Sequence, residues 1–196
     1  MADEPNEPQV EPLIISPKQL EGMELCRKKK MVLFSGPRYS GKTCAAITVV
    51  CDHAWNTDRA NIAIVSVSQS AGLDSGIWED LISEILPKYM ALGQGMKWIR
   101  KPFIAASTKK PALEVTNKYG TKSKIQLESL KFEHEVEERF KGKRYSMMYV
   151  PELSNFKKRK TFDIWAESLR MLHLKESEHL FLADTNPADE GEDSWI

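Results

Sequence analysis

Long apolar runs are missing from this sequence of 196 residues. No segment approaches the ~20 apolar residues of a membrane-spanning helix, which excludes an integral membrane protein. The first residues have neither the basic start nor the apolar stretch of a secretory signal. The three cysteines, Cys26, Cys44 and Cys51, include no C-x-x-C pair, so they provide neither a disulfide framework nor a zinc site. We therefore expect a protein of the reducing cytoplasm that does not bind a membrane.

Net charge is also absent, because 28 basic residues balance 28 acidic ones. The total argues against a uniformly basic nucleic-acid binder. The charges are unevenly placed, however: acids concentrate at both ends of the chain, and three basic runs lie between them, at 27–30, 139–144 and 157–160. Neutrality overall is therefore compatible with local contacts to DNA.

The beginning of the chain differs in composition from the rest. Residues 1–12 contain four acids and three prolines but no basic residue. Such a segment cannot bury enough apolar surface to fold, so residues 1–13 are predicted to be a disordered acidic tail. With no linker-like segment further on, residues 14–196 are expected to form a single domain.

The elements expected in the first half form a strand–helix–strand unit. Ser16 and Gln19 make a capping box at the start of a short helix. The apolar pattern then predicts a strand buried on both faces, a helix and a second buried strand. The ranges are 17–26 for the first helix, then 31–35, 42–55 and 61–67. This order implies a parallel sheet with a right-handed crossover.

The second half continues the alternation, with one exception. Helices are predicted over 77–90 and 162–174, and strands over 145–150 and 179–183, whereas 103–130 has the pattern of antiparallel strands around a turn at 118–121. The fold class is therefore α/β, with a mainly parallel central sheet flanked by helices and an antiparallel insertion around 103–130.

A phosphate-binding motif lies between the first predicted strand and the helix that follows it. Its eight residues match G-x-x-x-x-G-K-[ST]: Gly36, Pro37, Arg38, Tyr39, Ser40, Gly41, Lys42 and Thr43. The glycines let backbone N–H groups close around phosphate oxygens, and the helix N-terminus adds a favourable field. Lys42 would reach the β- and γ-phosphates, Thr43 would coordinate Mg²⁺, and Arg38 could stabilise γ-phosphate charge. The motif predicts a P-loop NTPase that binds ATP and Mg²⁺.

The acidic partner of such a loop is expected at the end of a buried strand, as Asp for the metal followed by Glu for the attacking water. After the predicted strand 145–150, Glu152 occupies the position of the catalytic base, but Pro151 occupies the Asp position. Proline cannot bind a metal. Magnesium would then depend on Thr43, phosphate oxygens, water and either Glu152 or Asp184.

In this ordered set of motifs the chain resembles the large subunit of the tailed-bacteriophage terminase, the motor that packages DNA. The segment 16–19 resembles the family's upstream motif, and the loop at 36–43 carries its arginine at the third position. Residues 145–152 are similar to the family's acidic strand, and 140–144 resemble the usual approach to it. Thr185, Asn186 and Pro187 resemble its coupling motif. The resemblance covers about residues 14–196.

The resemblance implies roles for several residues. Gln19 would read adenine, and Thr185 and Asn186 would couple ATP hydrolysis to movement of double-stranded DNA into a capsid. It also implies a portal protein, a terminase small subunit and a homo-oligomeric ring as partners, in the cytoplasm of the host cell. A complete large subunit would continue with a nuclease domain, so we expect the chain to be either an excised or truncated ATPase domain or a prophage remnant.

Two alternatives to a packaging ATPase remain open at this point. With Pro151 in the metal-binding position, the chain could bind nucleotide but hydrolyse it weakly or not at all, as an assembly module. It could also belong to another P-loop class, such as a helicase-like ATPase or a small-molecule kinase. A second domain with further arginine motifs would favour a helicase, and an acceptor-binding lid would favour a kinase.

DNA contact is predicted from charge alone. The run Lys157, Lys158, Arg159 and Lys160 follows Glu152 closely, so it should lie near the nucleotide end of the sheet. Contacts to phosphates need positive charge on one surface and no base-specific pattern. These four residues are therefore the leading candidates for DNA binding.

Overall fold

The computed structural model describes residues 12–67, 76–93, 95–100, 111–130 and 132–186. The predicted tail at 1–13 falls almost entirely outside this part of the chain, as does Pro187. Within it, one sheet of seven strands has the order β1-β7-β6-β2-β5-β4-β3. The strands are β1 (Met31–Ser35), β2 (Asn61–Ser66), β3 (Trp98–Arg100), β4 (Ala112–Thr116), β5 (Lys122–Ser129), β6 (Met147–Val150) and β7 (Leu180–Thr185).

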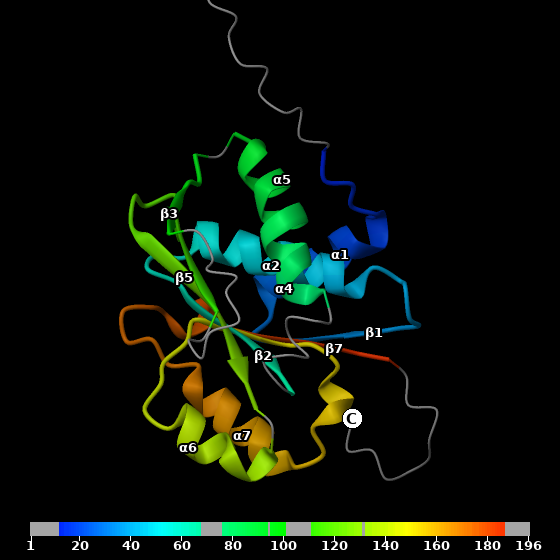
Figure 1. The fold of residues 1–196 in the computed structure, drawn as a ribbon, viewed down its shortest axis with the longest axis vertical. Coiled ribbons are helices and arrows are strands. Elements are labelled where there is room, and N and C mark those ends of the chain that lie inside the picture. The colour runs from blue at the N-terminus through cyan, green and yellow to red at the C-terminus, as the bar shows by residue number, and fades with distance from the viewer. Residues whose placement is uncertain (1–11, 68–75, 94, 101–110, 131, 187–196) are drawn as a thin grey trace, which may run out of the picture.

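Helices cover both faces of the sheet (Figure 1). On one face lie α1 (Pro17–Lys28), α2 (Lys42–Asn56), the short helix α4 (Ile77–Glu79) and α5 (Leu86–Ala91); on the other lie α6 (Val136–Phe140) and α7 (Arg159–Ser168). Single turns of 3₁₀ helix occupy Glu133–Glu135, Leu153–Asn155 and Glu176–Glu178. In the described part of the chain, no helix is long and apolar enough to cross a membrane.

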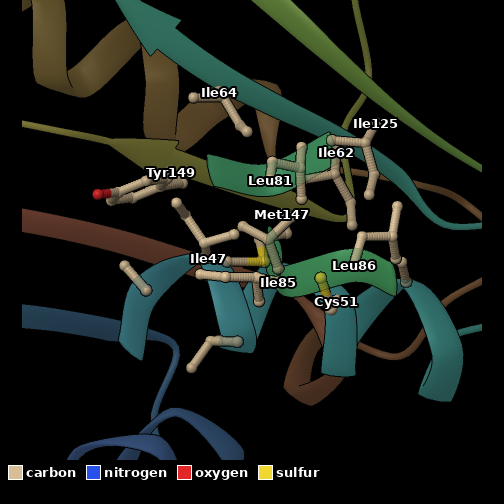
Figure 2. Close-up of a cluster of buried hydrophobic side chains, with 14 of the residues drawn as sticks. Ile47, Cys51, Ile62, Ile64, Leu81, Ile85, Leu86, Ile125, Met147 and Tyr149 are labelled. Atoms are coloured by element: carbon tan, nitrogen blue, oxygen red, sulfur yellow. The ribbon is translucent and has the colours of Figure 1, made fainter. Parts of the chain in front are cut away.

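The sheet is parallel from β1 to β5 and antiparallel at its far edge. β5 pairs with β2 in parallel and with β4 antiparallel, so the expected antiparallel pair is present and is joined to the parallel part through β5. Side chains of alternating residues enter two apolar clusters, one under α1, α2 and α5 and one under α6 and α7. Figure 2 shows the first cluster, in which Ile47 and Cys51 of α2 face Ile62 and Met147 of the sheet.

Burial of 31–35 on both faces was predicted, and this is wrong. β1 lies at the edge of the sheet, and its residues alternate between exposed and half-buried. Val32 and Phe34 pack against the cluster of α1 and α2, whereas Met31 and Leu33 are 53% and 43% exposed. A continuous apolar run identifies a strand but not its neighbours, and here the helices of the second face do not extend over the edge.

Two predicted helices differ from the structure in detail. The segment 77–90 contains a π-helical turn, Asp80–Ile85, between α4 and α5. Pro87 lacks the N–H donor of a regular α-helix, and the wider turn before it, in which the Leu86 N–H donates to the Leu81 carbonyl, accommodates this. The helix predicted over 162–174 instead spans Arg159–Ser168, and the backbone N–H of Met171 then donates to His179 Nε2 at 2.9 Å.

Candidate nucleotide site at the phosphate loop

The phosphate loop connects β1 to α2 through a backbone that includes two left-handed residues. Gly41, which immediately precedes α2, has φ of 77°, and Tyr39 at the tip of the loop has φ of 60°. The left-handed conformation favours glycine there, and a Cβ atom at position 41 would lie 2.4 Å from Gln19 Nε2, so that a side chain would displace this amide. The Tyr39 and Arg38 side chains are exposed at the loop surface.

Lys42 is folded back into the loop. Its Nζ donates to the carbonyl oxygens of Gly36 and Pro37, both at 2.7 Å, and lies 3.3 Å from Ser40 Oγ. A fourth acceptor is Asn186 Oδ1, at 3.2 Å, from the end of β7. The ammonium group is thus held at the centre of the loop by neutral oxygens, which the oxygens of an anionic phosphate can replace with stronger bonds.

Gln19 links α1 to this loop. Its Oε1 accepts the Ser16 N–H at 2.8 Å and the Ser16 hydroxyl accepts the Gln19 N–H, which completes the predicted capping box. Its Nε2 donates to the Gly41 carbonyl at 2.9 Å. Gln19 also lines a smaller cavity of about 370 Å³ with Phe34 and Pro37 on the α1 side of the loop. Whether this amide reads adenine stays a prediction.

A buried carboxylate, that of Asp184 at the end of β7, lies beside the loop. Asp184 is 3% exposed, and its Oδ1 accepts the Glu152 N–H at 3.0 Å. Its Oδ2 accepts a short hydrogen bond from the Tyr149 hydroxyl, which also interacts with the Thr43 side chain. Burial, and next the negative charge of Asp184, raise the pKa of Tyr149 well above its ordinary value. The tyrosine therefore remains a hydroxyl donor between the loop and β7.

Glu152 follows β6 in a left-handed conformation, with φ of 49° and ψ of 57°. This backbone is uncommon outside glycine and is held by the bond from its N–H to Asp184. The side chain is exposed, and its Oε2 accepts the Asn155 amide at 3.1 Å. Pro151, which precedes it, is buried.

One cavity of about 660 Å³ joins most of these groups. It is lined by Arg38, Tyr39, Ser40, Gly41, Lys42, Thr43, Ser66, Val67, Ile77, Asp80, Pro151, Glu152, Asn155, Asp184 and Asn186. Its volume is in the range of small-molecule sites. Thr185 does not line it; the Thr185 hydroxyl donates to the Asn186 carbonyl at 3.0 Å.

The residues present fit a triphosphate and a divalent cation. The loop offers backbone N–H groups at the start of α2 and an ammonium held by replaceable oxygens, and the opposite wall offers the oxygen ligands that Mg²⁺ prefers. The Thr43 hydroxyl and a carboxylate of the opposite wall, Glu152 or Asp184, could hold the cation, whereas Pro151 cannot. In the described residues no group of three His, Cys, Asp or Glu side chains forms a metal site by itself. Phosphate oxygens of a bound nucleotide could supply further ligands.

The basic run lies outside the cavity. Lys157, Lys158, Arg159 and Lys160 are exposed where α7 begins, and Lys160 forms a 3.1 Å ion pair with Glu137 of α6. The first turn of α7 contains no acidic residue. Basic side chains are unfavourable at this positive end of a helix.

Sequence reasoning brought together Lys42, Thr43, Glu152 and Asn186, and all four line one cavity in the structure. It missed Tyr149, because a tyrosine within an apolar run is typical of a core residue. It also missed the contact between Lys42 and Asn186, because no sequence pattern reports that the end of β7 lies beside the loop.

A known protein family matches most of this chain. The family described as terminase large subunit, T4likevirus-type, N-terminal, matches residues 33–188. No curated protein matches the chain.

The solved structures that resemble the chain include the large terminase of a thermophilic bacteriophage, with a TM-score of 0.65 and 18% identity over 89% of this chain. A crystal of the same terminase in complex with ATP-γ-S gives a TM-score of 0.58 at 16% identity over 88% of this chain. The ATPase domain of the Thermus phage P74-26 large terminase gives 0.57 at 14% identity, over 88% of this chain and 65% of that one.

At these identities the solved structures show the fold, which is that of P-loop NTPases. The chain spans about 40% of the length of the thermophilic bacteriophage terminase. The family match covers most of the chain and includes the phosphate loop, β6 and β7. The chain therefore belongs to the T4-type terminase large-subunit family, of which it matches the N-terminal region.

Proposed function

We propose that this chain binds and hydrolyses ATP, and that hydrolysis drives double-stranded DNA into a viral capsid. The observation that carries the proposal is the single cavity that joins the Lys42 ammonium to Glu152 and Asn186. The thermophilic bacteriophage terminase, of similar fold, has been crystallised with ATP-γ-S and with ADP. This supports assignment of the cavity to an adenine nucleotide.

Each residue has a defined part in the reaction we propose. Lys42 exchanges the Gly36 and Pro37 carbonyls for phosphate oxygens, and exposed Arg38 adds positive charge as the γ-phosphate leaves. Glu152 accepts a proton from the attacking water, with its carboxylate oriented by Asn155. Mg²⁺, when bound beside Thr43, neutralises charge on the phosphates.

The test is steady-state phosphate release by the wild type, Lys42→Ala and Glu152→Gln. Loss of the ammonium or the base should each reduce turnover by about 100-fold or more. Lys97→Ala removes an exposed lysine before β3 and is the matched control, which should retain wild-type turnover. Wild-type turnover no faster than that of Lys42→Ala would refute hydrolysis at this site.

A second candidate is supported by Pro151. Because this residue cannot bind a metal, the chain could hold nucleotide as an assembly module without turning it over. ATP binding by calorimetry, together with phosphate release at the background rate, would support this module over the motor.

We propose Lys157, Lys158, Arg159 and Lys160 as the DNA contact. All four side chains are exposed in one short stretch at the start of α7, and contacts to DNA phosphates need only such a concentration of positive charge on one surface. If all four bind phosphates, replacing them with glutamine should flatten the slope of log affinity against log salt by roughly 3 to 4 units. A control variant with Arg59, Lys97, Lys118 and Lys122 replaced, all exposed, should keep the wild-type slope. Equal slopes for both variants would reject this surface.

The larger assembly is proposed from the family alone. A ring of such subunits, working with a portal protein and a terminase small subunit in the host cytoplasm, would place the motor at the capsid entrance. Pull-down of the portal protein by the complete large subunit, and its loss when the ATPase region is deleted, would test this placement.

A further inference from the structure

We infer that Asp184, at the end of β7, provides the metal-directed carboxylate that the usual acidic strand would provide at position 151. The inference rests on the proposed function, because the cation it concerns is the one that accompanies ATP. Two residues act together here, since Asp184 faces the cation and Tyr149 positions its carboxylate.

The strand register places Asp184 level with position 151, where proline replaces the expected Asp. In the parallel pair of β6 and β7, Val150 is opposite Ala183, so the next residues along the two strands are Pro151 and Asp184. On its other side β7 pairs with β1, where Phe34 is opposite Asp184, two residues before the phosphate loop. A carboxylate at 184 therefore stands at the same edge of the sheet as position 151, on the strand adjacent to the loop strand.

Among the described residues, no ion pair compensates the charge of Asp184. The side chain is nearly fully buried and lines the cavity with Lys42 and Thr43, yet it forms no ion pair with any residue in the described ranges. Its two hydrogen bonds come from neutral donors, the Glu152 N–H and the Tyr149 hydroxyl. A buried carboxylate is costly without a cationic partner, and each oxygen retains a lone pair for one.

Tyr149 connects this carboxylate to the loop. Its ring packs in the apolar cluster, and Figure 2 shows its hydroxyl pointing out of that cluster. The hydroxyl donates to Asp184 and also interacts with the side chain of Thr43, the loop residue expected to hold Mg²⁺. The side chains of Thr43 and Asp184 therefore both adjoin the Tyr149 hydroxyl before any nucleotide binds.

Glu152 is less suited to the cation. Its side chain is exposed and accepts the Asn155 amide, and its backbone N–H is itself a donor to Asp184. The same contact fixes the left-handed turn that presents Glu152 to the cavity. Asp184 thereby holds the base in place while it faces the metal, so the two carboxylates have separate roles.

The experiment compares the affinity for ATP-γ-S in Mg²⁺ with that in EDTA, by calorimetry, for the wild type, Asp184→Asn and Asp163→Asn. Asparagine keeps the shape of residue 184, and Asp163 is an exposed aspartate on α7 that serves as the charge-matched control. The tightening by Mg²⁺ is the ratio of the ATP-γ-S affinity in Mg²⁺ to that in EDTA. We expect this ratio to fall about 10-fold in Asp184→Asn, with the affinity in EDTA preserved. It should stay at the wild-type value in Asp163→Asn. An unchanged tightening in a folded Asp184→Asn variant would overturn the inference.

Pro151→Asp gives a test that does not depend on the folding of Asp184→Asn. If Asp184 already serves the cation, a new carboxylate at 151 should change the tightening by less than about twofold, whereas a 10-fold gain would contradict the inference. The double variant Pro151→Asp with Asp184→Asn should recover part of the tightening by Mg²⁺ that Asp184→Asn alone loses. Failure of the wild type to bind ATP-γ-S in either buffer would instead refute the proposed function, and the inference with it.

Discussion

Buried His53 should make the stability of this protein pH-dependent. His53 of α2 is half-buried as a residue, but its Nε2 is buried and, within the described residues, has no hydrogen-bond partner. Burial lowers the pKa of His53 to about 4, opposed by the charge of nearby Asp52 and assisted by His179. We expect the wild type to lose stability on acidification more steeply than a His53→Leu variant.

Proton binding determines the direction in which the free energy of unfolding changes with pH. Between about pH 6.5 and the folded pKa, the unfolded chain binds a proton at His53 that the folded protein excludes, so stability falls as the pH falls. The complete shift corresponds to roughly 3 kcal/mol, and the part lost between about pH 7.5 and about pH 5 is about 2 kcal/mol. Other titrating groups add to the wild-type dependence but cancel in the difference between the two proteins.

The assay is urea unfolding of both proteins at the two pH values. The free energy of unfolding should drop by about 2 kcal/mol more in the wild type than in His53→Leu. His134→Leu, at an exposed histidine, should follow the wild type. Parallel losses in the wild type and His53→Leu would refute the account of a histidine held neutral by burial.

Two further predictions concern particular contacts. Lys143→Met removes the cation that lies 2.7 Å from buried Glu128, and it should lower the free energy of unfolding by about 2 kcal/mol in urea titrations, less than for a fully buried pair because Lys143 is partly exposed. Replacement of both residues, as Lys143→Met with Glu128→Gln, should recover part of that loss. Gln19→Ala breaks the bond to the Gly41 carbonyl, so stability should fall by about 1 kcal/mol and the ATP affinity measured by calorimetry should weaken. Unchanged ATP affinity would show that the link from α1 does not support the loop.

Local patterns in the sequence predicted the parts of the fold that depend on local physics. The capping box at Ser16 and Gln19, and the apolar runs of β2 and β7, could be located because capping and burial are set by nearby residues. The phosphate loop was located for the same reason, since its function requires residue types at fixed spacing.

Features that depend on neighbours in space could not be predicted. The exposure of Met31 and Leu33 follows from the edge position of β1, which no local pattern records. Tyr149 differs from the other apolar residues of β6 only because β7 places Asp184 beside its hydroxyl. Likewise, α7 ends at Ser168 because the following segment turns back to bond His179, eight residues beyond Met171.

The edge position of β1 also has a consequence for handling the protein. In the described part of the chain β1 pairs only with β7, so its outer edge offers free backbone donors and acceptors next to the apolar side chains of Met31 and Leu33. Such an edge can recruit a strand from another molecule, and lysines near it oppose that by repulsion. Lys28, Lys29 and Lys30 immediately precede β1. Because salt screens their charge, self-association should increase at high ionic strength, and light scattering would detect it.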